Sequence, residues 1–102
     1  MPERPFRFGV VVAGAASAAA WVEKARTVAA SGYDVLLMPD GLSHLMAPFP
    51  ALAVAADAAQ GLRVGTYVLA NDFRNPLLVA QNAATLNFLT DGRFELGLGA
   101  GR

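Results

Sequence analysis

One pattern repeats along the chain: a short apolar run rich in β-branched residues, a loop, and a longer apolar segment with helical spacing. The strand-like runs cover 6–12, 35–38, 62–69 and 93–98, and the three segments between them have the spacing of helices. The predicted order is therefore β-α-β-α-β-α-β with short connections, which is typical of a parallel sheet built from right-handed crossovers. We expect a single α/β domain over residues 1–102 whose strands all point the same way.

Cap and turn residues set the bounds of the three expected helices. The first begins after Ser17, whose hydroxyl can accept an unpaired backbone N–H, and it ends at Gly32, where a left-handed residue costs least. The second begins at Pro50 and the third at Pro76, because proline is tolerated in a first helical turn. The third helix is predicted to end at Leu89, before an Asp-Gly pair.

The third helix has two apolar stripes on roughly opposite sides, and one packing layer cannot bury both. One stripe has Val79, Ala83 and Leu86, and the other has Leu77, Ala84 and Phe88. The second helix is rich in alanine, so it can approach a neighbour closely. We therefore expect a homodimer or a higher oligomer that covers this apolar surface.

Composition excludes several classes of protein. Hydrophobic residues make up 55% of the chain, which excludes disorder, and eight basic residues balance eight acidic ones without a basic cluster that would bind nucleic acid or an anionic membrane. The absence of cysteine and the presence of a single histidine, His44, argue against a metal centre. Without a secretory signal or an apolar run of about 18 residues, a cytoplasmic chain that acts on a small molecule is expected.

Three polar residues follow expected strands and are candidates for a site. Asp40 has a carboxylate that could bind donors on a cofactor, or it could cap the turn at Gly41. His44 has the intrinsic pKa for proton transfer near neutral pH, although a lone loop histidine is more often simply exposed. Asn71 offers a donor and an acceptor to a planar heterocycle, or it could favour a turn.

Glycines alternate at the end of the chain, at Gly97, Gly99 and Gly101. Their spacing differs from the Gly-x-Gly-x-x-Gly of dinucleotide-binding folds, and no helix follows, so we reject that interpretation. Small residues at a strand end allow a ring to approach the backbone; alternatively, they are only a glycine-rich end.

Two blocks of sequence resemble a known superfamily. The segment 66–76, Thr-Tyr-Val-Leu-Ala-Asn-Asp-Phe-Arg-Asn-Pro, and the segment 91–101, Asp-Gly-Arg-Phe-Glu-Leu-Gly-Leu-Gly-Ala-Gly, closely resemble the luciferase-like monooxygenases, and within them the deazaflavin (coenzyme F-420) oxidoreductases. The resemblance implies a (β/α)8 TIM barrel that binds F-420 or FMN at the carboxyl ends of its strands. Such a barrel takes about 250 residues, so this chain would supply the N-terminal half, truncated after the fourth strand.

The resemblance also implies a set of site residues. The third strand would carry a non-prolyl cis peptide between Tyr67 and Val68 under the cofactor ring, although an ordinary trans strand is the alternative. Further cofactor contacts are implied at Asp40, Ala70, Asn71, Gly99 and Gly101. Deazaflavin enzymes commonly have Asp-His after the second strand, whereas this chain has Asp-Gly there, so His44 becomes the catalytic candidate.

Two functions remain open for the chain. The first is the N-terminal part of a flavin- or deazaflavin-dependent oxidoreductase that carries out hydride transfer or monooxygenation on a small organic substrate, with the cofactor supplying the redox chemistry. On this hypothesis the isolated 102 residues are expected to be inactive. The second is a non-catalytic half-barrel that self-associates through its exposed edge strands and its second and third helices.

Overall fold

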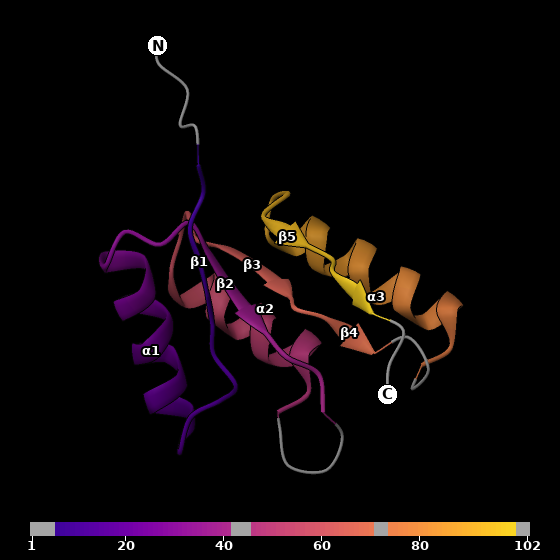
Figure 1. Cartoon of the computed structure of the whole chain (residues 1–102), viewed down its shortest axis with the longest axis horizontal. Helices are drawn as coiled ribbons and strands as arrows, with labels where there is room; N and C mark the ends of the chain where they lie inside the picture. The colour runs from indigo at the N-terminus through magenta and orange to yellow at the C-terminus, as the bar shows by residue number, and fades with distance from the viewer. Residues whose placement is uncertain (1–5, 42–45, 71–73, 100–102) are drawn as a thin grey trace.

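Three helices lie on one face of a parallel sheet (Figure 1). The computed structural model describes residues 6–41, 46–70 and 74–99. Its elements, in chain order, are β1 (Gly9–Val11), α1 (Ala18–Ala30), β2 (Val35–Met38), α2 (Pro48–Ala58), β3 (Arg63–Thr66), β4 (Leu69–Ala70), α3 (Pro76–Leu89), β5 (Phe94–Glu95) and β6 (Leu98–Gly99). In these described ranges, no helix has both the length and the hydropathy that crossing a membrane requires.

All of the strand pairs are parallel, as the sequence pattern predicts. The main sheet has the order β1-β2-β3-β5, and β4 pairs with β6 beyond it. The register sets Val10 beside Leu36, Leu36 beside Val64, and Val64 beside Phe94. The carboxyl ends of the strands therefore meet at one edge of the sheet, where parallel α/β proteins place their sites.

The two strands predicted over 62–69 and 93–98 are each broken into two pieces, which corrects the sequence prediction. The break in the first coincides with the Tyr67–Val68 peptide, which is cis. Next to this break, the Thr66 hydroxyl replaces backbone hydrogen bonds between the two strands. Its Oγ1 donates to the Gly97 carbonyl and accepts from the Gly97 N–H, both at 2.9 Å. A side chain that satisfies both groups of Gly97 allows the ladder to be interrupted there without leaving buried polar groups unpaired.

Two other bounds differ from the sequence prediction. The first strand is shorter, and α2 begins at Pro48 rather than at Pro50. Ala47 is extended and precedes the helix, so both prolines fall within the first turn, where their missing N–H groups have no helical partner to lose. Ser17 caps α1 as predicted, because its Oγ accepts the N–H of Ala20 at 3.1 Å.

The hydrophobic core lies between the sheet and the helices. Leu36, Met38 and Val64 on the strands pack against Trp21 of α1 and Leu52 of α2, and all five side chains are buried. The indole Nε1 of Trp21 donates to the Ala51 carbonyl at 2.8 Å, so the one polar atom of that side chain is satisfied inside the helix interface.

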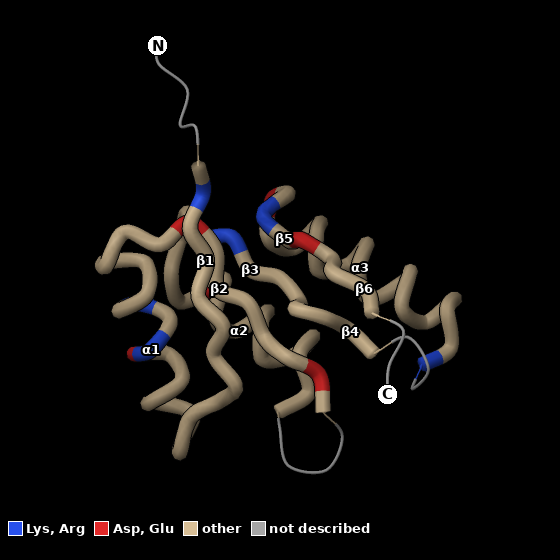
Figure 2. Tube along the Cα trace, viewed as in Figure 1, with Lys and Arg blue, Asp and Glu red and all other residues tan. Residues whose placement is uncertain are grey.

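Charged residues gather near the amino-terminal ends of the strands (Figure 2). Glu95 follows the buried Phe94, so it points away from the helices, and it pairs with Arg7 and Arg63 at 2.5 Å each. Burial raises the pKa of the Glu95 carboxyl, but hydrogen bonds from the two arginines and their charges outweigh burial and hold that pKa below its usual value. Within the described ranges the helices cover one face of the parallel sheet, which is consistent with part of a barrel.

Candidate functional site

The carboxyl ends of β2 and β4 are joined by Asp40. Asp40 comes two residues after β2, and Ala70 is the last residue of β4. The Ala70 backbone N–H donates to Asp40 Oδ2 at 2.8 Å. The Asp40 side chain is 1% exposed, so its carboxylate must find its partners within the protein.

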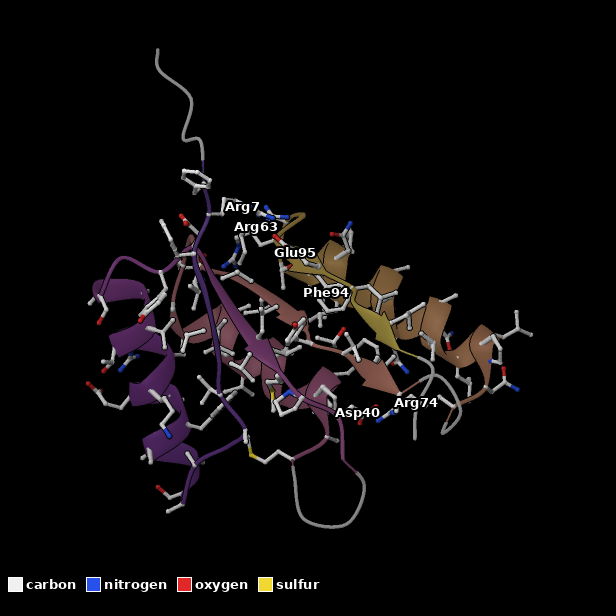
Figure 3. All side chains as sticks on the ribbon, in the orientation of Figure 1. Arg7, Asp40, Arg63, Arg74, Phe94 and Glu95 are labelled. Carbon is white, nitrogen blue, oxygen red and sulfur yellow. The ribbon has the colours of Figure 1, made fainter. Side chains whose placement is uncertain are left out.

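Arg74 supplies the charge that balances Asp40 (Figure 3). Its guanidinium Nη2 donates to Asp40 Oδ1 at 2.8 Å, and Nη1 donates to Oδ2, so the pair is bidentate. The carboxylate bonds to β4 and to the residue before the α3 cap, two segments of the chain that follow β3. Arg74 was not predicted as a site residue from the sequence. The signal that could have indicated it is a basic residue in one strand-end loop and an acidic residue, Asp40, in the loop after the neighbouring strand.

The two residues joined by the cis peptide have exposed side chains, and that of Val68 lies against the last strand. Tyr67 is 61% exposed and Val68 is 40% exposed. A Cβ built on Gly99 would lie 2.4 Å from Cγ2 of Val68, and one built on Gly97 would lie 2.5 Å from the Thr66 carbonyl oxygen. These two glycines are therefore required by the approach of the neighbouring strand itself.

Five of the predicted site residues come together at one edge of the structure. Ala70 pairs with Gly99, Val68 packs against Gly99, and Tyr67 precedes Val68, while Asp40 bonds to Ala70. His44, Asn71 and Gly101 lie outside the described residues. Among the residues that are described, no group of three or more His, Asp or Glu side chains could hold a metal ion.

A groove of about 590 Å³ lies between α1 and α2. Its lining is almost entirely apolar and includes Trp21, Val22, Met46 and Val54. None of the predicted site residues lines it. The candidate site is therefore the open edge formed by the strand ends, not this groove.

Comparison with known protein families gives one match across nearly the whole chain. The family model described as luciferase-like monooxygenase matches residues 5–102. The 4-hydroxyprotoasukamycin monooxygenase of Streptomyces nodosus subsp. asukaensis is 36% identical over 74 residues, which are 69% of this chain and 20% of that protein. The F-420-dependent glucose-6-phosphate dehydrogenase of Beutenbergia cavernae is 38% identical over 79 residues, which are 70% of this chain and 24% of that protein. The chain thus spans about a fifth to a quarter of these relatives.

Solved structures show the same fold. The coenzyme F-420-dependent tetrahydromethanopterin reductase from Methanopyrus kandleri superposes with a TM-score of 0.85 at 22% identity, covering 94% of this chain and 27% of that one. The oxygenating constituent of 3,6-diketocamphane monooxygenase from Pseudomonas putida, in complex with FMN, has a TM-score of 0.80 at 18% identity, covering 94% and 30%. At these identities the likeness concerns the fold alone.

Proposed function

Because the chain belongs to the luciferase-like monooxygenase family, we propose that it forms the cofactor-facing part of a flavin- or deazaflavin-dependent oxidoreductase. The observation that carries the proposal is the gathering of Asp40, the Tyr67–Val68 peptide, Ala70 and Gly99 at the carboxyl ends of parallel strands. Barrel enzymes build their sites at this end. The names of the relatives include F-420-dependent enzymes and monooxygenases, and one structural neighbour holds FMN, so both F-420 and FMN are candidates.

The described residues fit a flat, largely apolar ring. Tyr67 and Val68 offer exposed apolar surface, and Ala70 and Gly99 beside them are too small to block an approach to the strand ends. In our proposal these residues bind one face of the ring and exclude water from it. When bound, the cofactor would accept a hydride from a small organic substrate or donate one to it. Two further cofactor contacts, Asn71 and Gly101, are proposed from the sequence alone. His44 is proposed, also from the sequence alone, as the residue that transfers a proton.

Titration of the chain with FMN and with F-420, followed by cofactor fluorescence, tests this proposal. We expect a saturable change with one of them, and we expect Val68→Glu to weaken that binding about tenfold or more, because a carboxylate would face the ring in a partly buried position. Val54→Glu on α2 is the matched control, because Val54 is 47% exposed and lies away from the strand ends. No saturable change with either cofactor, or equal losses in the two variants, would count against the proposal.

We also propose that the chain associates with a second copy of itself through α3, and this alternative function needs no catalysis. Leu77, Leu78, Phe88 and Leu89 of α3 are between 57% and 80% exposed, and Leu77 and Phe88 among them belong to the second apolar stripe predicted from the sequence. Apolar surface of this kind on one helix favours a protein partner.

Sedimentation equilibrium tests the association. We expect the wild-type chain to sediment as a dimer or larger, and Phe88→Glu to shift it to the monomer, because the charge would be buried unpaired in the interface. Thr27→Glu adds the same charge to an exposed position on α1 and should leave the mass unchanged. A monomeric wild type, or equal effects of the two substitutions, contradicts the proposed dimer.

A further inference from the structure

We infer that Asp40 and Arg74 act as a pair of positioning residues, which hold the end of β4 and the start of α3 in place and do not contact the cofactor themselves. The consequence for cofactor binding rests on the proposed function, while the pair itself stands on the geometry of the described residues. From the sequence, Asp40 was predicted to contact the cofactor, and no role was predicted for Arg74.

Both carboxylate oxygens of Asp40 already accept hydrogen bonds from within the chain. Oδ1 accepts from Arg74, and Oδ2 accepts from both Arg74 and the Ala70 N–H. With the Asp40 side chain 1% exposed and the Arg74 side chain 19% exposed, little of the carboxylate is left for an incoming ligand. A cofactor that bonded to Asp40 directly would have to displace a partner from a buried ion pair, which is strongly unfavourable.

The two partners of Asp40 lie at the end of a strand and just before a helix. Ala70 ends β4, two residues after the cis peptide, and it pairs with Gly99 of β6. Arg74 directly precedes Asn75, whose Oδ1 caps α3 by accepting the Leu77 N–H at 2.8 Å. One carboxylate therefore fixes both the end of the strand and the entry to the helix.

Arginine is a suitable partner for a buried carboxylate such as that of Asp40. A buried carboxylate needs a counter-charge, and arginine is suited to the task because its planar fork binds both oxygens at once and stays protonated. If the guanidinium is lost, the buried Asp40 carboxylate lacks a counter-charge and must turn toward water, so it holds the Ala70 N–H less well. Arg74 thus acts on Ala70 through Asp40, without touching it.

A double-mutant cycle of Asp40→Asn, Arg74→Met and the double variant tests the inference in the whole chain. Two quantities are measured: hydrogen exchange at the Ala70 amide, and the dissociation constant for FMN or F-420. We expect Arg74→Met to speed exchange at Ala70 about tenfold or more, while the Tyr67 amide, which bonds to the Met38 carbonyl at 2.8 Å, keeps its protection. Each single substitution should weaken cofactor binding about equally, and the double variant no more than either.

Matched controls remove the same chemical groups elsewhere. Arg26→Met and Asp57→Asn change exposed side chains on α1 and α2 and should alter neither quantity. Arg74→Lys keeps the positive charge but cannot bind both carboxylate oxygens, so it should restore part of the protection from exchange at the Ala70 amide. This variant also keeps the inference testable if Arg74→Met does not fold.

Three outcomes overturn the inference. Loss of cofactor binding in Asp40→Asn but not in Arg74→Met would make Asp40 a direct ligand, and additive losses in the double variant would show that the two residues act separately. Unchanged exchange at Ala70 in Arg74→Met would show that the pair does not hold β4. If the wild type binds neither cofactor, the proposed function fails, and the exchange measurement still decides the role of the pair.

Discussion

Arg93→Met is expected to lower the free energy of unfolding by about 2–4 kcal/mol. The guanidinium donates from Nη1 to the Leu62 carbonyl at 2.7 Å and to the Ala59 carbonyl at 3.3 Å, and Nε donates to the Thr90 carbonyl at 2.8 Å. These carbonyls follow the ends of α2 and α3, where helices leave acceptors unpaired and carry partial negative charge. Methionine keeps the length of the stem but satisfies none of these carbonyls.

Urea denaturation of Arg93→Met and of Arg26→Met measures this effect. Arg26 is exposed on α1, and the hydrogen bond from its Nε to the Ala58 carbonyl is long at 3.5 Å. We expect its substitution to change stability by less than about 0.5 kcal/mol. Equal midpoints for the two variants would show that Arg93 does not hold the helix ends together.

Gly97→Ala is expected to destabilise the chain by about 1–3 kcal/mol and to weaken cofactor binding. A Cβ at this position would lie 2.5 Å from the Thr66 carbonyl oxygen, and a backbone atom cannot move aside as a flexible side chain can. The two strand pieces must separate, and the hydrogen bonds between the Thr66 hydroxyl and Gly97 lengthen. Val68, which packs beside this strand, then loses its place at the proposed site.

Gly14→Ala provides the comparison for that experiment. The nearest atom to a Cβ at Gly14 is Cγ of Met46 at 3.5 Å, which is ordinary contact, so we expect a change within about 0.5 kcal/mol. The unfolding midpoints of the two variants and their cofactor titrations test this prediction. If Gly97→Ala is as stable as Gly14→Ala, the close approach of the strands is not essential.

Local sequence patterns predicted most of the fold. Ser17 and Pro76 mark helix starts that the structure confirms, and the short strand 35–38 has its predicted bounds. The predictions that were wrong are the length of the first strand, the start of α2 at Pro50 and the two strands that are broken. At those strands a contact between residues distant in sequence, Thr66 with Gly97, replaced the regular ladder, and no local pattern announces such a contact.

The candidate site was predicted less completely. The resemblance implied the cis peptide between Tyr67 and Val68, and the structure confirms it. Asp40 was singled out as a strand-end carboxylate, but its partner Arg74 was missed because the two residues are 34 positions apart. An arginine in a loop can have many roles, and its role is defined by the residue with which it pairs, here Asp40.

The sequence by itself determined the order of the elements, the helix caps and the common direction of the strands. These features depend on the spacing of apolar residues and on caps within a few positions, so they can be read locally. The tertiary structure alone decided that Asp40 bonds to Ala70 and Arg74, and that Gly97 and Gly99 lie against β3 and β4. Those contacts depend on which strands become neighbours and in what register, and that is set by packing across the whole sheet.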